Sequence, residues 1–78
     1  MNVEVRLFAS LRDRLPKETG GVTHLELPSD VKVTDLLREL AIPRDQQLIF
    51  MVNGRRELES APLQDGDRVG IFPPVGGG

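Results

Sequence analysis

The segment NVEVRLF, residues 2–8, decides the fold class because apolar and polar residues alternate along it. Val3, Val5 and Leu7 fall on one side of an extended chain, and the residues between them fall on the other. A period of two predicts a half-buried β-strand. A second alternating stretch, residues 23–27, is expected to pair with this strand as a hairpin.

Helical periods interrupt this alternation at two places. Leu11 and Leu15 lie four residues apart, which suggests a short helix over residues 9–15. The principal helix is expected over residues 35–41, with Thr34 as its N-cap. The apolar face of that helix should consist of Leu36, Leu37, Leu40 and Ala41.

The second half of the chain predicts further strands and turns. Residues 48–52 are five consecutive apolar residues, as in an interior strand, and Asn53-Gly54 is a strong tight-turn signal. A closing strand over residues 68–72 follows the turn Asp65-Gly66-Asp67. Two hairpin-like units thus flank one helix, which predicts an α+β roll whose mixed sheet has four to five strands. Too little chain remains to cover the second face of that sheet.

Composition excludes several classes of function. A chain of 78 residues forms one small domain and has little room for a deep pocket, so an enzyme that works alone is not expected. The absence of cysteine excludes thiolate metal sites and a cysteine nucleophile. A formal net charge of −2 argues against nucleic acid as the ligand, and no apolar run suits a membrane span. We therefore expect a cytoplasmic protein. We also expect it to be a monomer when isolated.

The segment FPPVGGG at residues 72–78 is the strongest functional signal. Pro73-Pro74 should stop the last strand and project the chain stiffly, because proline lacks an N–H and fixes φ. The glycines Gly76, Gly77 and Gly78 carry no side chain and could thread a narrow channel in another protein. Ordering them costs roughly 1–2 kcal/mol each, so the folded body must supply affinity. The alternative is a frayed terminus.

Other candidate residues have structural interpretations. His24 is the only histidine and should be a solvated surface residue on the polar face of a strand, beside Glu26. The carboxylates of Asp65-Gly66-Asp67 suit a turn better than a catalytic pair. Gly20-Gly21 lacks the spacing of a phosphate loop and should belong to a loop. Arg55-Arg56 is either a solvated hairpin tip or a rim contact for an acidic partner.

Three stretches together resemble the MoaD/ThiS family of ubiquitin-like sulfur carriers. They are LQDGDRVGIFPPVGGG at residues 63–78, VEVRLFASLRDRL at residues 3–15, and VNG at residues 52–54. The start of the chain is nearer to MoaD than to ThiS. The resemblance implies a β-grasp domain over residues 1–75, followed by a flexible tail over residues 76–78.

The same resemblance implies the chemistry of the tail. An activating enzyme would adenylate Gly78 with ATP, and a sulfur donor would convert the adenylate to a thiocarboxylate. The large subunit of molybdopterin synthase, or another acceptor synthase, would then receive the sulfur. No cofactor or metal would be bound. The resemblance and the tail together assign partner contacts to Gly76, Gly77, Phe8, Phe72, Pro73, Pro74 and Val75.

Two rival functions use the same activated glycine. One is a ThiS-like carrier for thiamin thiazole or tRNA thiolation, which the three final glycines favour and the start of the chain disfavours. The other is a ubiquitin-like modifier joined to lysines of target proteins. A free-standing enzyme is disfavoured, because no nucleophile, base and orienting group can be assembled from this sequence.

Overall fold

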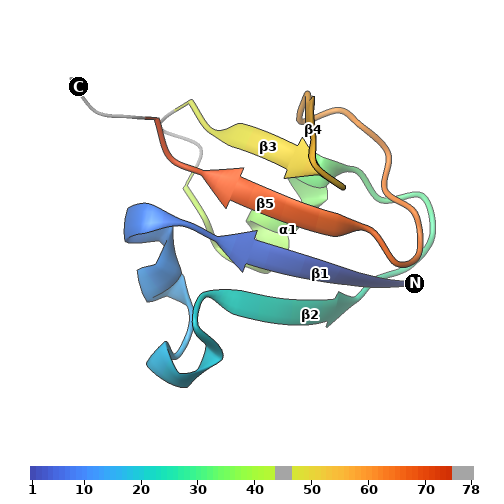
Figure 1. The fold of residues 1–78 in the computed structure, drawn as a ribbon. Helices are drawn as coiled ribbons and strands as arrows, with labels where there is room; N and C mark the ends of the chain where they lie inside the picture. The colour runs from blue at the N-terminus through green and yellow to red at the C-terminus, as the bar shows by residue number, and fades with distance from the viewer. Residues whose placement is uncertain (44–46, 75–78) are drawn as a thin grey trace.

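The computed structural model describes residues 1–43 and 47–74, which form a five-stranded sheet packed against one α-helix (Figure 1). Two short 3₁₀ helices, η1 and η2, join the first two strands. The elements in chain order are β1 (Asn2–Leu7), η1 (Ala9–Arg14), η2 (Lys17–Thr19), β2 (Val22–Glu26), α1 (Val33–Glu39), β3 (Ile49–Val52), β4 (Arg55–Glu57) and β5 (Arg68–Phe72).

The strands lie in the order β2-β1-β5-β3-β4, so the first and last strands of the chain are central neighbours. They run parallel, with Val5 opposite Val69, whereas β1–β2, β5–β3 and β3–β4 are antiparallel. Two hairpins therefore flank α1 in sequence and are joined in space by the β1–β5 pair. The predicted α+β roll with a mixed sheet is confirmed.

The core lies between α1 and one face of the sheet. The apolar residues of β1 all point into it, since Val3, Val5 and Leu7 are almost fully buried, as their alternation predicts. From α1, Leu36 and Leu37 fill the centre. The other buried apolar residues are Leu11, Leu27, Val33, Ile42, Phe50, Val52, Leu63, Val69 and Ile71.

The start of α1 differs from the prediction, and Thr34 is not its N-cap. The helix begins earlier, with Lys32 as the cap residue, and the Asp35 carboxylate accepts a hydrogen bond of 2.7 Å from the Lys32 N–H. The Val33 N–H donates to the carbonyl of Ala61 at 2.9 Å. Val33 is fully buried, so packing of this residue extends the helix backward past the threonine.

The end of α1 also corrects the predicted apolar face. The helix ends at Glu39, and Ala41 is exposed with a left-handed φ of 55°, so Ala41 does not pack on the core. Ile42 is buried in its place, with its N–H donating to the carbonyl of Leu37 at 2.8 Å. The Ala41 carbonyl instead accepts a hydrogen bond of 2.9 Å from Arg14 Nη1.

The β1–β2 connection is more ordered than a loop. The predicted helix over residues 9–15 is the 3₁₀ helix η1, in which Leu11 is buried and Leu15 follows as a half-buried residue. Such a short segment gains little from α-helical hydrogen bonds, since helices of this length are marginal without packing. Between η1 and β2 the chain also forms η2, which ends at Gly20 in the left-handed conformation.

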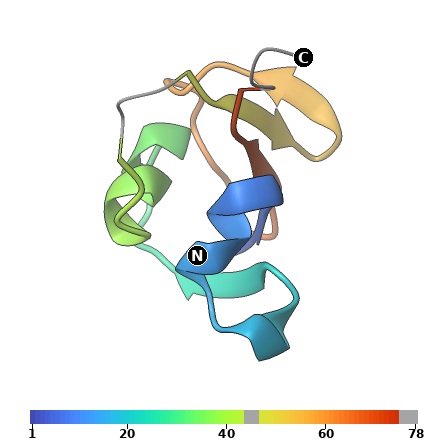
Figure 2. The ribbon, with the colours of Figure 1, turned by 90° about the vertical axis from the view of Figure 1, so that its left-hand side faces the viewer.

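Helix α1 covers one side of the sheet only, as the two ribbon views together show (Figures 1 and 2). Within the described ranges, no helix or strand lies over the opposite side. Strand register places one set of side chains on that side, which we call the open face. The open face comprises Asn2, Glu4, Arg6, Val22, His24, Glu26, Ile49, Met51, Arg56, Arg68, Gly70 and Phe72.

Candidate functional site

The last strand leaves the sheet from its interior rather than from an edge. Near its end, Ile71 lies opposite Leu7 of β1, and Phe72 lies opposite Ile49 of β3. Strand β5 ends at Phe72, as the following prolines predict, because neither Pro73 nor Pro74 has an N–H to continue the ladder. The path of the chain is therefore fixed on both sides up to the first proline.

Phe8 and Phe72 form a stacked pair at this exit point. Their ring centroids are 4.1 Å apart and their planes differ by 3°. A backbone hydrogen bond of 3.2 Å from the Phe8 N–H to the Ile71 carbonyl holds the two segments together. The Phe72 ring also lies over Gly70, since its Cε1 is 3.3 Å from where a Cβ on Gly70 would stand. Phe8 and Phe72, two of the predicted partner-contact residues, thus form one apolar surface.

A shallow hollow lies on the other side of the exit, against β3 and β4. Leu48, Ile49, Leu58 and Pro74 contribute apolar side chains to it. Leu58 is 77% exposed, the highest value among the large apolar side chains in the described part of the chain. The sequence analysis did not predict this hollow; the signal available was a lone leucine in a polar, irregular stretch.

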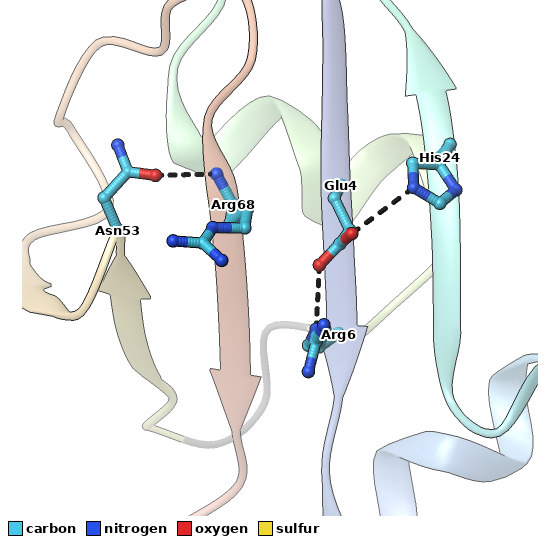
Figure 3. A network of polar contacts seen from close by, with 5 residues as sticks. All are labelled: Glu4, Arg6, His24, Asn53 and Arg68. Carbon is cyan, nitrogen blue, oxygen red and sulfur yellow. Dashed lines mark hydrogen bonds and ion pairs between the residues drawn. The ribbon is translucent and has the colours of Figure 1, made fainter.

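Polar side chains occupy the open face beside the apolar surface of Phe8 and Phe72 (Figure 3). The Glu4 carboxylate accepts a hydrogen bond of 2.8 Å from Arg6 Nε, and its other oxygen lies 3.4 Å from His24 Nε2. The hydrogen bond from Arg6 lowers the pKa of Glu4, partial desolvation opposes this shift, and the charge of Arg6 and the proximity of His24 lower the pKa further. The contact between Glu4 and Arg6 is a surface ion pair, so it contributes little to the free energy of unfolding.

The carboxylates of the Asp65-Gly66-Asp67 turn have structural roles, as predicted. Asp65 Oδ1 accepts a hydrogen bond of 2.6 Å from the Asn2 N–H. Asp67 accepts hydrogen bonds from Asn53 Nδ2 at 2.9 Å and from the Gln64 N–H at 2.8 Å. Asn53 Oδ1 in turn accepts from the Arg68 N–H at 3.0 Å (Figure 3). These bonds tie the β3–β4 turn to the start of β5.

The remaining candidates lie apart from the strand exit. His24 is exposed, as expected, although its contact is with Glu4 across the strands rather than with Glu26 beside it. No cluster of three or more potential metal ligands occurs among the described residues. Arg55 and Arg56 are exposed in β4, directly after the turn. In the same described ranges, no helix is long and apolar enough to span a membrane.

The predicted reactive end lies outside the part of the chain that the structure describes. This applies to Val75, Gly76, Gly77 and Gly78, and to the division between a domain at residues 1–75 and a tail at residues 76–78. These assignments stay predictions. The described part of the chain ends at Pro74, two residues after Phe72, the last residue of a strand that lies between β1 and β3.

Known proteins share this architecture. A structure from Pyrococcus furiosus, described as a putative molybdopterin converting factor subunit 1, is 31% identical, with a TM-score of 0.74 over 96% of this chain and 99% of that one. Small archaeal modifier protein 1 from Methanosarcina acetivorans is 27% identical, with a TM-score of 0.70 over 99% of this chain and 96% of that one. A complex of subunits 1 and 2 of molybdopterin-converting factor from Helicobacter pylori contains a chain 23% identical, with a TM-score of 0.64 and full coverage of both.

These likenesses and the topology define the class of protein: the chain has the β-grasp, ubiquitin-like fold. The sequence model of the ThiS family matches residues 5–78, nearly the whole chain. The chain therefore belongs to the ThiS family of ubiquitin-like sulfur carriers, and the predicted resemblance is confirmed. A search of curated proteins gave no match.

Proposed function

We propose that this chain is a sulfur carrier that is adenylated and then thiocarboxylated at Gly78, and that it donates its sulfur in molybdopterin biosynthesis. The observation that carries the proposal is the exit of β5 from the sheet interior, beside the stacked Phe8 and Phe72, directly into Pro73-Pro74. That arrangement suits a body that docks by its surface and delivers the following segment to a partner's active site.

The chemistry requires only a carboxylate on the carrier. A carboxylate oxygen of Gly78 would attack the α-phosphorus of ATP, which forms an acyl-adenylate and releases pyrophosphate. Hydrosulfide would then attack the acyl carbon, so that a C–S bond forms, the C–O bond to AMP breaks, and AMP leaves with the proton taken up by solvent. The carrier keeps one sulfur in place of one oxygen.

The catalytic groups are assigned to partners. The sequence has no cysteine that could hold sulfur as a persulfide. The carboxylates that the sequence places next to each other, Asp65 and Asp67, are already engaged in turn hydrogen bonds. The proposed partners are an activating enzyme, a sulfur donor and the large subunit of molybdopterin synthase, met in turn in the cytoplasm by a carrier that is monomeric between encounters.

The assignment to molybdopterin is supported by the likeness to the Pyrococcus furiosus protein, a putative molybdopterin converting factor subunit 1, which is 31% identical over nearly the full length of both chains. The second candidate is a protein modifier, which the likeness to the Methanosarcina acetivorans modifier protein favours. Both functions use the same activation step. They differ in the second step. A carrier gives up its sulfur when the nucleophilic thiocarboxylate sulfur bonds to a carbon of the acceptor, whereas a modifier forms an amide when a lysine amine attacks the activated acyl carbon.

The test separates activation from delivery. Carrier-dependent exchange of pyrophosphate into ATP should occur with the activating enzyme and full-length chain, and should be lost when Gly77 and Gly78 are deleted. The thiocarboxylated chain is then offered to the molybdopterin synthase large subunit with its pterin substrate and to thiazole synthase, and the adenylated chain is offered to lysine-bearing proteins. Sulfur transfer to the pterin supports the proposal, whereas transfer only to thiazole, or covalent adducts on lysines, would replace it with one of its rivals.

A further inference from the structure

Two arginines lie on the open face close to the stacked phenylalanines. Register gives their positions, because Arg56 of β4 lies opposite Met51 of β3, and Met51 lies opposite Gly70 of β5. Arg68 precedes Gly70 by two residues and so shares its side of the sheet. Since the Phe72 ring lies over Gly70, the two cations border one apolar patch.

The nearest carboxylate on this face cannot neutralise Arg68. Glu4 lies directly opposite Arg68 in the β1–β5 register, but its oxygens are directed to Arg6 and His24 (Figure 3). Within residues 1–43 and 47–74, neither Arg56 nor Arg68 has an acidic partner at ion-pair distance. Among the described residues, the open face therefore presents two guanidinium groups without an ion-pair partner, although the whole chain carries a net charge of −2.

The apolar patch between these cations consists of half-buried side chains. Phe72 and Met51 are only partly covered by the fold, and the Phe8 ring stacks on the Phe72 ring. Aromatic residues, methionine and arginine are the types enriched in protein–protein interfaces. Guanidinium groups bind carboxylates through two parallel hydrogen bonds, which adds geometric selectivity to charge attraction.

We infer that the open face is the docking surface for the activating enzyme, and that Arg56 and Arg68 make this docking selective for charge. The two arginines would bind acidic side chains of the enzyme that border the cleft accepting the tail. The inference rests on the proposed function, and it adds the residues that determine which partner binds. Partly exposed charge pairs at the border of an interface mainly speed encounter and reject wrong partners. Such contacts also release readily, as a carrier that changes partners requires.

The matched control is the neighbouring residue Arg55. It lies opposite Val52 rather than Met51, so its register points to the other side of the sheet, while its exposure and its distance from the tail along the chain are nearly the same. Arg55→Glu and Arg56→Glu make the same charge change at adjacent positions. If the two variants differ in their KM for the carrier, the cause is therefore the face of the sheet on which the charge lies and not the change in net charge.

The experiment measures ATP–pyrophosphate exchange by the activating enzyme of the same organism as a function of carrier concentration. Arg56→Glu and Arg68→Glu should each raise the KM for the carrier about tenfold with kcat nearly unchanged, and Arg55→Glu should change it less than about twofold. Arg56→Lys keeps the charge without the planar fork and should fall between wild type and Arg56→Glu. Added salt should raise the wild-type KM more steeply than that of the Arg56→Glu Arg68→Glu double variant.

The outcomes separate the inference from the function on which it rests. If wild type is activated but Arg56→Glu equals wild type or Arg55→Glu, the docking surface is wrong and the carrier function stands. If the glutamate variants lose only binding to the synthase large subunit, the assigned partner is wrong. Absence of exchange with wild type overturns both. Urea midpoints equal to wild type establish that each variant is folded.

Discussion

Gly21 should tolerate no side chain, although the sequence indicates only a loop at this position. It has a φ of +84°, and a Cβ there would stand 2.8 Å from the Leu7 carbonyl oxygen. That oxygen belongs to β1 and cannot move away easily, because the Leu7 N–H donates to the Gly21 carbonyl at 2.7 Å. The adjacent Gly20 also has a positive φ, of +66°, but its Cβ would meet nothing within 4 Å.

The two glycines together separate backbone strain from steric contact. An alanine with a left-handed φ costs about 1–2 kcal/mol, offset by about 0.4–1 kcal/mol from the stiffer unfolded chain, so Gly20→Ala should lose at most about 1.5 kcal/mol. Gly21→Ala adds overpacking against a backbone atom, about 1–3 kcal/mol. Its total loss should be about 1–4.5 kcal/mol, and Tm falls by roughly 4–8 °C for each kcal/mol in a domain of this size.

Urea and thermal unfolding followed by circular dichroism measure both variants against wild type. The reasoning requires Gly21→Ala to be the less stable of the two by at least about 1 kcal/mol. Equal losses would refute it, because they would mean that the conformation alone, and not the approach of β1, demands glycine. A Gly21→Ala protein as stable as wild type would show that this connection does not pack as described.

Further predictions concern the core and the open face. Leu36→Ala should lower the free energy of unfolding by about 2–5 kcal/mol, because Leu36 is fully buried. Leu58→Ala should change the free energy of unfolding by less than about 0.5 kcal/mol, because Leu58 is 77% exposed. Similar losses for the two variants would contradict the core assignment. Glu4 has a lowered pKa in the folded state, so its contribution is present above the ordinary glutamate pKa and is lost as pH falls through the folded value. Urea midpoints of wild type and Glu4→Gln should therefore converge on acidification, and a constant or growing gap would count against the Arg6 contact.

The sequence predicted the structure best where a local pattern or a single residue type determines it. Alternation along residues 2–8 predicted which side chains of β1 are buried, and Pro73 predicted the end of β5. Long-range packing decided the rest. The N-terminus of α1 depends on burial of Val33 and a bond to Ala61, which no local capping rule contains.

The candidate site followed the same division. The Pro73-Pro74 pair after the last strand could be recognised in the sequence. Phe8 and Phe72 were predicted as partner contacts, and that role stays a prediction. Their stacking on each other depends on parallel pairing of the first and last strands, which brings distant residues together. Strand β4 was not predicted as a separate element, because its residues are all exposed and charged and have no alternation.

The central claim is that the carboxylate of Gly78 carries sulfur. Its most direct test is intact-mass and fragment analysis of the chain after incubation with the activating enzyme, ATP and inorganic sulfide, with an ATP-free reaction as the control. The account predicts one exchange of oxygen for sulfur, dependent on ATP and located on the last residue. Sulfur on any other residue, or an unchanged mass when the enzyme demonstrably consumes ATP with this carrier, would contradict it.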